Sequence, residues 1–389
     1  MLWFGQVGAA GSNWMEQLAR PLLILELTNS ALMVGLITAT RLVPQLILGI
    51  WAGVLADRLD KRRILLVSKS ITFLMHASTA AIILTGIIEP WMVFVTTFVA
   101  GSAMAFDNPA RQSLIPRMVP REYLSNAIAL NSAAMNVMRI GGPSIAGLVL
   151  AFAGLGDLYL LQSIVYVSVI YCTLRIKTVT KEERREGSSM MSELLEGFDA
   201  VRADKIIFYI LVMNLVLFVW GFPYQHVFIP LIAIEELGIG RSGAGLLISV
   251  TGIGALMGSL TVATFGDRLQ HRGLVMLAQI LIFGGALFFF SRVEHVALAV
   301  PCLILTGAMQ VSFMALNTSF VLGRTPTELH GRVMSLFSLD RGLVPLGATI
   351  GGVLAAAFGP QNGLLIMSIV CIACGLVVTI WMPAIRRLQ

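Results

Sequence analysis

The fold of this chain is decided by one stretch, Gly53-Val54-Leu55-Ala56-Asp57-Arg58-Leu59-Asp60-Lys61-Arg62-Arg63. Six of the seven residues at 57–63 are charged, and long apolar segments flank the stretch on both sides. Each Lys, Arg or Asp at the centre of a bilayer costs roughly 2.5–3.5 kcal/mol on insertion scales. We therefore expect 57–63 to be a short turn in water between two membrane helices, and we expect it to fix which way the protein faces.

The composition is that of an integral membrane protein. Of the 389 residues, 57% are hydrophobic and only 12% are charged, whereas a soluble domain has about a quarter charged residues. The formal net charge of +6 could suggest nucleic acid as a partner. The basic residues lie in short loops, however, so orientation in a lipid bilayer explains them better. We expect the bilayer as a partner, and no nucleic acid.

The apolar pattern predicts an all-α membrane protein with twelve transmembrane helices. A spanning helix needs about 20 apolar residues, and polar or Gly/Pro-rich breaks mark its ends. The predicted spans are 3–27, 31–56, 64–87, 91–113, 123–153, 157–175, 204–233, 242–265, 272–291, 295–322, 332–357 and 361–382.

One long polar segment separates the sixth predicted span from the seventh. Its centre, 181–186, is a charge run of the kind found in solvated linkers. Apolar residues at helical spacing follow it, which predicts a helix on the inner membrane surface at 190–203. We expect an N-terminal six-helix bundle at 1–176, a cytoplasmic linker at 177–203 and a C-terminal six-helix bundle at 204–389.

The distribution of Lys and Arg over the loops predicts the orientation. If the turn at 57–63 is cytoplasmic, every second loop must be too, and the opposite loops hold only Arg241 and Arg292. Since cytoplasmic loops carry an excess of Lys and Arg, we expect a multi-pass protein of the cell (inner) membrane with both termini in the cytoplasm. The cytoplasmic set comprises Arg111, Arg117, Arg121, the segment 175–205, Arg268, Arg272, Arg324, Arg332, Arg386 and Arg387.

The two halves of the chain echo each other. Gly266-Asp267-Arg268-Leu269-Gln270-His271-Arg272 lies between the eighth and ninth predicted spans, where the charged turn lies between the second and third. Arg139-Ile140-Gly141-Gly142-Pro143 in the fifth span is echoed by Arg341-Gly342-Leu343-Val344-Pro345 in the eleventh. Two pseudo-symmetric six-helix repeats are a known plan of secondary transporters.

The charged turn resembles a family signature. Gly53-x-Leu55-Ala56-Asp57-Arg58-x-x-Lys61-Arg62 resembles the loop between helices 2 and 3 of the major facilitator superfamily, with Asp60 where the general pattern has Gly. The stretches 106–112 (Phe-Asp-Asn-Pro-Ala-Arg-Gln) and 126–131 (Asn-Ala-x-Ala-Leu-Asn) are similar to the branch that includes the enterobactin exporter and macrolide-efflux-like proteins. The resemblance covers essentially the whole chain and implies a secondary transporter that works by alternating access.

A second stretch, Gly142-Pro143-Ser144-Ile145-Ala146-Gly147, is similar to the helix 5 signature of antiporters and implies export. It has Ala146 where that signature usually has Gly, and it lacks an upstream Gly at position 138. Pro143 removes a backbone donor and bends the helix, while Gly142 and Gly147 allow close helix approach. Ordinary packing of Gly and Pro in a membrane helix explains the stretch equally well.

Enzymatic chemistry and metal binding find no support in the sequence. No Gly-rich loop followed by Lys-Ser/Thr is present, so ATP hydrolysis by this chain is not expected. The four cysteines lie in apolar segments and the five histidines lack ligand spacing, so we expect neither a metal site nor a cofactor. We therefore expect a transporter that draws on an ion gradient or on the gradient of its substrate.

Charged residues deep in the predicted spans face a bundle interior or a water cavity and are functional candidates. Glu16 and Arg20 share one helix face because they are four residues apart, so Glu16 is either a proton carrier or half of a static ion pair. Asp340 is the second candidate for proton coupling. Two acids against four arginines leave an excess of two positive charges if all are ionised, which favours an anionic or polar substrate. The six residues are Glu16, Arg20, Arg41, Arg139, Asp340 and Arg341.

Four uncharged polar residues at similar depth complete the candidate substrate cavity with the four arginines, although each of them could simply tie helices together. They are Asn131, Asn214, Gln225 and His226. Gln225 and His226 are favoured because Pro223 lies next to them, and a broken helix would present backbone groups to a cavity. Lys69 is expected to extend its ammonium group to the inner membrane surface.

The charged turn is also a candidate conformational gate. Asp57 is expected near the positive N-terminal end of the eleventh span, around Gly331, and Lys61 or Arg62 near Asp107. The alternative is a turn that only orients the protein by its charge. The predicted gate residues are Gly53, Asp57, Arg58, Lys61, Arg62 and Asp107.

These observations predict a monomeric transporter that exports a small organic compound, drug-like or siderophore-like, in exchange for protons. A lipid or lysophospholipid flippase and an importer on the same fold are the alternatives, and the deep charges disfavour the flippase. A receptor that transports nothing is a further alternative, less favoured because such proteins carry added domains.

Overall fold

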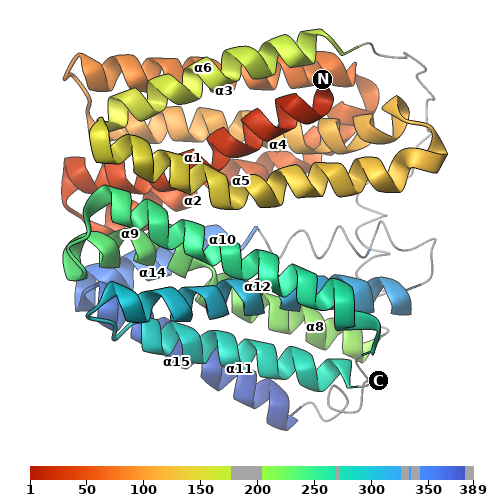
Figure 1. The fold of residues 1–389 in the computed structure, drawn as a ribbon, viewed down its shortest axis with the longest axis vertical. Coiled ribbons are helices and arrows are strands. Elements are labelled where there is room, and N and C mark those ends of the chain that lie inside the picture. Colours follow the sequence, from red (N-terminus) through yellow and green to blue (C-terminus); the bar gives the residue numbers. More distant parts are fainter. Residues whose placement is uncertain (177–203, 269–270, 326–332, 334–341, 382–389) are drawn as a thin grey trace. The chain divides into compact units, whose positions relative to one another are not determined.

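A computed structural model describes residues 1–176, 204–268, 271–325, 333 and 342–381. These residues fold into helices joined by short connections, with no β-strand among them (Figure 1). The helices of the first half are α1 (Leu2–Thr28), α2 (Ala31–Arg58), α3 (Lys61–Leu84), α4 (Pro90–Met118), η1 (Arg121–Tyr123), α5 (Leu124–Phe152) and α6 (Leu155–Leu174).

The second half begins with a long helical segment built from α8 (Lys205–Val216), η2 (Leu217–Gly221), η3 (Tyr224–Phe228), α9 (Ile229–Leu231) and η4 (Ile232–Glu236). It continues with α10 (Gly240–Phe265), η5 (Gly266–Arg268), α11 (Arg272–Phe290), α12 (Val296–Arg324), α14 (Val344–Phe358) and α15 (Pro360–Trp381).

The predicted spans agree with these helices to within about three residues, with two exceptions. Helix α4 continues to Met118, five residues past its predicted end. Only the later part of the predicted span 332–357 falls in the described residues, as α14. Ten helices of the described ranges are long and apolar enough to cross a membrane, and α14 is a shorter apolar helix. The chain is therefore a multi-pass membrane protein.

The charged turn is shorter than the predicted stretch 57–63, because the helices extend into it from both sides. Helix α2 ends at Arg58 and α3 begins at Lys61, so only two residues connect them. Asp60 is the N-cap of α3, and its Oδ1 accepts a hydrogen bond of 2.9 Å from the backbone N–H of Arg62. This cap accounts for Asp at the position where the general pattern has Gly, because a carboxylate satisfies an otherwise unpaired N–H group of the first helical turn.

The segment around Pro223 differs from the broken helix that we predicted. The chain stays helical from 205 to 236, with π-helical stretches at 217–221, 224–228 and 232–236. A π-helix bonds each N–H group to the carbonyl five residues back. The π-helical stretches on both sides of Pro223 let the helix continue past this residue, which has no N–H group to donate. The predicted surface helix at 190–203 lies outside the described residues.

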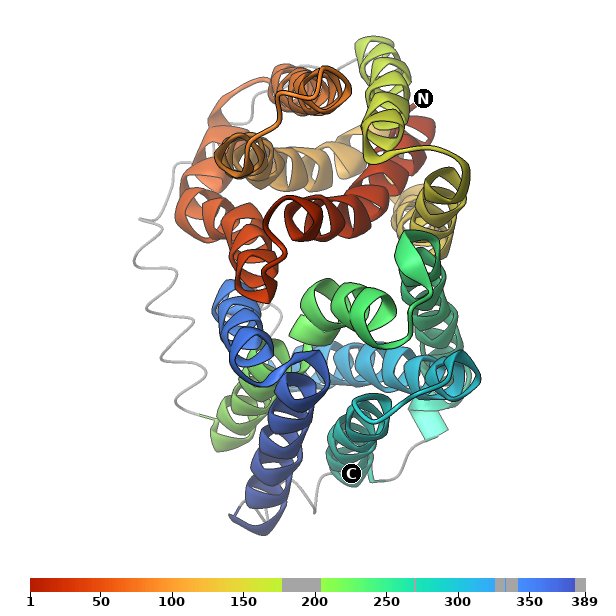
Figure 2. The same cartoon turned by 90° about the vertical axis from the view of Figure 1, so that its left-hand side faces the viewer.

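The chain divides into two compact units. Unit 1 comprises 1–184 with 239–249, and unit 2 comprises 185–238 with 250–389. In unit 1 the helices form a bundle in which α2 packs on α4, α3 on α6 and α4, and α1 on α5 (Figure 2). In unit 2, α11 packs on α12 and α15, and α14 packs on α15.

In each unit, a glycine at a matching helix position brings two helices into close contact. A Cβ atom on Gly101 of α4 would lie 2.4 Å from the carbonyl oxygen of Arg41 in α2. A Cβ atom on Gly307 of α12 would lie 2.1 Å from the carbonyl oxygen of Thr251 in α10. Each glycine lies eleven residues after the start of its helix, at Pro90 and at Val296. Small residues let membrane helices approach this closely, and the matching positions extend the internal repeat seen in the sequence.

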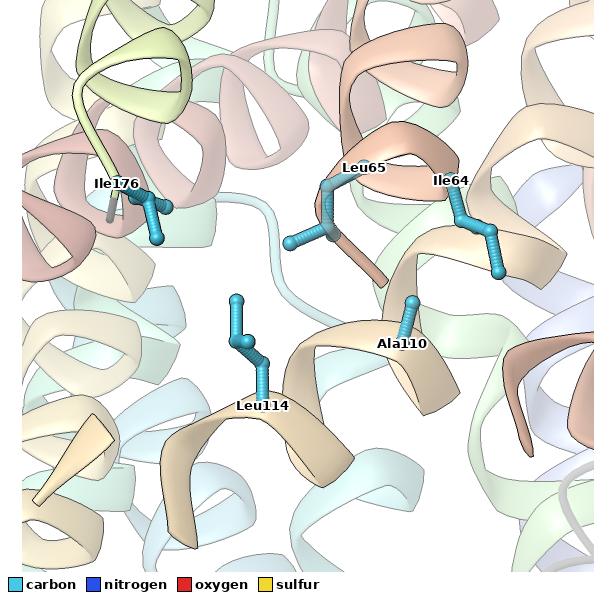
Figure 3. Close-up of a cluster of buried hydrophobic side chains, with 5 residues drawn as sticks. All are labelled: Ile64, Leu65, Ala110, Leu114 and Ile176. Atoms are coloured by element: carbon cyan, nitrogen blue, oxygen red, sulfur yellow. The ribbon is translucent and has the colours of Figure 1, made fainter. Parts of the chain in front are cut away.

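A cluster of apolar side chains joins three helices at one end of unit 1. Ile64 and Leu65 of α3 point toward Ala110 and Leu114 of α4, and Ile176, just after α6, completes the cluster (Figure 3). All five are buried. The cluster matters for the site, because the next turn of α3 after Leu65 carries Lys69, and Ala110 is followed directly by Arg111.

Candidate functional site

Unit 1 contains a polar cavity to which all six helices α1–α6 contribute. Its charged lining comes from Glu16 of α1, Arg41 of α2, Lys69 of α3, and Asp107 and Arg111 of α4. The other lining residues are Gln6, Ala9, Ala10, Asn13, Thr72, Ala100, Gly101, Met104, Asn108, Met135 and Tyr166. Five charged side chains around one cavity inside a bundle of apolar helices make it the candidate site.

Glu16 is held by arginines on two helices. Its Oε1 accepts a hydrogen bond of 2.7 Å from Nε of Arg20 and a second from Nη2 of the same residue. Its Oε2 lies 3.5 Å from Nη2 of Arg41, and that guanidinium also donates to Oδ1 of Asn13. Only 5% of Glu16 and 4% of Arg20 is exposed. The Glu16–Arg20 contact that the four-residue spacing predicted is therefore confirmed, and Arg41 joins it.

A buried histidine lies next to Glu16, outside the lining of the cavity. Nε2 of His76 in α3 lies 3.8 Å from Oε1 of Glu16. The imidazole lies beside the rings of Tyr159 and Tyr166 of α6, with ring centroids 6.0 and 5.3 Å away. Sequence reasoning did not select His76, because a lone histidine in an apolar helix carries no spacing signal.

The other end of the cavity is an ion pair between α3 and α4. Nζ of Lys69 lies 2.7 Å from Oδ1 of Asp107, and Nε of Arg111 lies 3.7 Å from Oδ2 of the same carboxylate. Arg111 also donates hydrogen bonds of 2.9 Å to Oδ1 of Asn108 and 3.1 Å to Oδ1 of Asn131. One carboxylate and two amide oxygens thus lie around the two buried cations.

This ion pair corrects two predictions. We predicted that Lys69 extends to the membrane surface, but only 7% of it is exposed, because Asp107 on the neighbouring helix offers a closer partner than water. We assigned Arg111 to a cytoplasmic loop, but α4 continues seven residues past it, and Arg111 is 7% exposed. A charge at the end of an apolar segment looks the same in sequence whether it faces water or the bundle.

A second, smaller cavity adjoins the first. Gln6, Lys69 and Arg111 line both of them, whereas Glu16 and Asp107 line only the larger. The smaller cavity is further lined by Met1, Leu2, Gly5, Leu65, Cys172 and Thr173. Lys69 and Arg111 therefore lie between two hollows of unit 1.

The remaining cavity candidates from the sequence lie elsewhere or outside the described residues. Arg139 stacks over the ring of Trp14, 5.5 Å from its centroid, and does not line the cavity. Oδ1 of Asn214 accepts a 2.6 Å hydrogen bond from Asn317, which ties α8 to α12. Gln225 and His226 belong to a π-helical stretch of unit 2, where Gln225 is buried. Asp340 and Arg341 are outside the described residues.

The predicted gate is seen in part. Gly53, Asp57 and Arg58 fall in α2, but their side chains, like Gly331, are not part of what the structure describes. Arg62 donates to the carbonyl oxygen of Leu174 at the end of α6, and Lys61 is buried at the start of α3. Asp107 forms ion pairs with Lys69 and Arg111, two residues that the gate prediction did not include.

The helix 5 stretch lies inside the continuous helix α5, where Gly142, Pro143 and Gly147 are all buried. A Cβ atom on Gly142 would lie 2.5 Å from Cβ of Trp14 and 3.0 Å from the carbonyl oxygen of Gly11. Gly142 thus lets α5 approach α1, the helix that carries Glu16. Within the described ranges, no three His, Cys, Asp or Glu residues lie close enough together to hold a metal ion.

Residues 1–387 match the family model of the transmembrane secretion effectors. The chain belongs to this family of major facilitator transporters. It is 26% identical over 367 residues to the staphyloferrin A transporter of Staphylococcus aureus, an alignment that covers 92% of this chain and 90% of the relative. It is 25% identical over 400 residues to macrolide efflux protein A of Streptococcus pyogenes, covering 100% and 96% of the two chains. Membership makes the chain a membrane transporter and not an enzyme.

Solved structures share the fold. The crystal structure of a nucleoside transporter superposes with a TM-score of 0.79 at 15% sequence identity and covers 98% of both chains. That of a D-xylose–proton symporter superposes with a TM-score of 0.75 at 13% identity, covering all of this chain and 97% of the other. At this identity the likeness shows the major facilitator fold alone, and the residues of the cavity must be interpreted on their own chemistry.

Proposed function

We propose that this transmembrane secretion effector exports a small polar organic compound by alternating access, driven by the entry of protons. The observation that carries the proposal is the cavity of unit 1, where six helices surround Glu16, Arg41, Lys69, Asp107 and Arg111. Charged side chains at membrane depth are costly and mark substrate or ion pathways. The direction is supported by relatives whose names describe efflux of macrolides and of several drugs, and by the antiporter-like stretch 142–147.

The proposed architecture is a pair of six-helix bundles, at 1–176 and 204–389, joined by a cytoplasmic linker at 177–203. With α1 and α14 counted as spans beside the ten long apolar helices, the proposed number of transmembrane helices is twelve. The matching glycine contacts at Gly101 and Gly307 support two related halves. The excess of Lys and Arg in alternate loops supports both termini in the cytoplasm of a cell membrane. We propose a monomer as the working unit.

The proposed substrate is polar, with a preference for anions. Glu16 and Asp107 supply two negative charges to the cavity network, and four cations surround them. The excess of two positive charges favours a ligand that brings negative charge. The four cations are Arg20, Arg41, Lys69 and Arg111. A lipid flippase would be better served by an apolar cavity, so it is the second candidate only.

Proton coupling requires an acid that exchanges its proton during the cycle. Glu16 and Asp340 are the acids that the sequence selects. The turn residues Asp57, Arg58, Lys61 and Arg62 are proposed to tie the inner ends of the two halves together while the cavity opens outward.

The test is transport by the purified protein in liposomes that contain a pH-sensitive dye. Compounds are added by class: carboxylates, neutral polar compounds, lipophilic cations and lysophospholipids. A polar or anionic compound that moves protons in the opposite direction supports the proposal. Compound and proton moving in the same direction would show an importer, and response only to lysophospholipids would show the flippase. Transport without any proton movement would refute coupling.

A further inference from the structure

We propose that the cavity of unit 1 binds an organic dianion, a molecule with two carboxylate groups joined by a short apolar spacer. This inference rests on the proposed export of a polar compound with a preference for anions, and it names the substrate class of the same site. Its ground is the distribution of charge in the cavity. Each of two ends has more cations than its carboxylate balances, and the two ends are too far apart for one anionic group.

At the first end, the carboxylate of Glu16 has two guanidinium partners. Arg20 donates two hydrogen bonds to its Oε1, and Nη2 of Arg41 lies 3.5 Å from its Oε2. His76, 3.8 Å from Glu16, adds no negative charge in either protonation state. Of the two arginines, Arg41 lines the cavity. It directs Nη2 to Asn13, which leaves the Nε and Nη1 donors of its guanidinium for a ligand.

At the second end, two buried cations again share one carboxylate. Nζ of Lys69 lies 2.7 Å from Oδ1 of Asp107, and Nε of Arg111 lies 3.7 Å from Oδ2. The other donors of Arg111 are directed to Asn108 and Asn131. The ammonium of Lys69 has three N–H donors, and its contact with one oxygen of Asp107 engages one of them. Lys69 can therefore donate to a second anionic group, as Arg41 can at the first end.

The two ends are about 10 Å apart along the helices. In α3, Lys69 lies seven residues before His76, which belongs to the first end. In α4, Asp107 lies six residues after Gly101, which packs against the carbonyl group of Arg41. At 1.5 Å per residue these separations are about 10 Å and about 9 Å. A charged hydrogen bond spans about 2.7–2.9 Å, so one anionic group cannot contact both ends, and a ligand that neutralises both needs two.

The rest of the lining suits an apolar spacer. Met104 lies midway between Gly101 and Asp107 in α4. A chain of methylene groups can bury apolar surface against such side chains and leaves no polar group of its own unpaired. The small and apolar lining residues are Ala9, Ala10, Ala100, Gly101, Met104 and Met135.

Helix packing fixes the separation of the two ends. The close approach of Gly101 to the backbone of Arg41 sets α2 against α4 at the first end. Near the second end, Leu65 and Ala110 belong to the apolar cluster that joins α3 to α4, one turn before Lys69 (Figure 3). Because the cations are mounted on packed helices, we expect the cavity to select dicarboxylates by their length.

The test is binding of straight-chain dicarboxylates of increasing length to the purified full-length protein in detergent, from succinate through glutarate, adipate and pimelate to suberate. Each is compared with the monocarboxylate of the same chain length, and with sulfate, which has two charges on one group. The rise in melting temperature with ligand concentration gives the dissociation constant. We expect one dicarboxylate to bind at least about tenfold tighter than its monocarboxylate and than sulfate, and the affinity to fall for shorter and longer chains.

Arg41→Gln and Lys69→Gln locate the two carboxylate sites. Each removes one cation and leaves the carboxylate of that end with a guanidinium partner, so neither creates an unpaired buried carboxylate. In each variant the preference for the dicarboxylate should fall from about tenfold to about one, because a single charged contact remains. Arg241→Gln is the matched control, since it makes the same change at an ion pair with Glu26 outside the cavity, and it should keep the preference. Lys69→Arg keeps the positive charge and should restore the preference, which guards against a misfolded Lys69→Gln.

Equal affinities for monocarboxylates and dicarboxylates at every length would overturn the inference and leave the proposed export of a polar compound standing. Sulfate that binds as tightly as the best dicarboxylate would also overturn it, because one anionic group would then suffice. A preference that survives in Arg41→Gln or in Lys69→Gln would refute the two-ended site. Binding of lipophilic cations alone in the same assay would overturn both the dianion and the proposed polar substrate.

Discussion

Gly101→Ala tests the packing that positions the cavity. The new Cβ atom would lie 2.4 Å from the carbonyl oxygen of Arg41 and 3.2 Å from its carbonyl carbon. Ordinary contact begins at 3.4 Å, so α2 and α4 must separate by about 1 Å at this point. The obstacle is backbone and cannot rotate away. Overpacking of this kind costs roughly 1–3 kcal/mol.

The expected loss of stability can be converted into a melting temperature. Unit 1 comprises 184 residues from 1–184 and 11 from 239–249, about 195 in all. At roughly 2–4 °C per kcal/mol for a unit of this size, the melting temperature should fall by about 2–12 °C. The shift also moves the backbone of Arg41, whose guanidinium lies 3.5 Å from Glu16, so transport should fall with stability.

The assay is thermal unfolding in detergent, followed by transport in liposomes, with Gly49→Ala as control. Gly49 lies in the same helix α2, and a Cβ atom there would meet no atom within 4 Å. Alanine in a helix interior is favoured over glycine by roughly 0.5–1 kcal/mol, so the control should be neutral or slightly stabilised. Equal melting temperatures for the two variants would refute the close approach of α4 to Arg41.

Three further outcomes are expected. Gly307→Ala in unit 2, whose Cβ atom would lie 2.1 Å from the Thr251 carbonyl oxygen, should destabilise as Gly101→Ala does; a neutral effect would contradict the repeat. Glu16→Gln leaves buried arginines without their carboxylate and should lose about 3–5 kcal/mol of stability, much of it regained in Glu16→Gln/Arg20→Gln; unchanged unfolding of the single variant would contradict the static ion pair. Burial alone would raise the pKa of Asp204, but hydrogen bonds from Arg324 and Ile206 lower that pKa below its usual 3.8. Since a lowered carboxylate pKa stabilises the fold above the unfolded-state value and the effect is lost as pH falls through the folded-state value, Arg324→Gln should melt below the wild type at pH 7, and the gap should close below about pH 4; a gap independent of pH would contradict this.

The sequence by itself determined where the chain crosses the membrane. The spans follow from runs of about 20 apolar residues, and the turn at 57–63 follows from charges that hydrocarbon excludes. The contact of Glu16 with Arg20 was also available, because residues four apart on a helix always share a face. These features depend on local chain geometry and on the solvent, and both can be read from consecutive residues.

Only the tertiary structure decided which deep charges meet across helices. Lys69 and Asp107 lie on different helices, and their contact depends on how far each helix is rotated and shifted along its neighbour. Hydropathy does not encode that rotation; the close approaches at glycines such as Gly101, and apolar clusters such as Leu65 with Ala110, set it. Because the sequence does not encode this rotation, we predicted Lys69 and Arg111 at the membrane surface. In the folded bundle, both residues line two cavities.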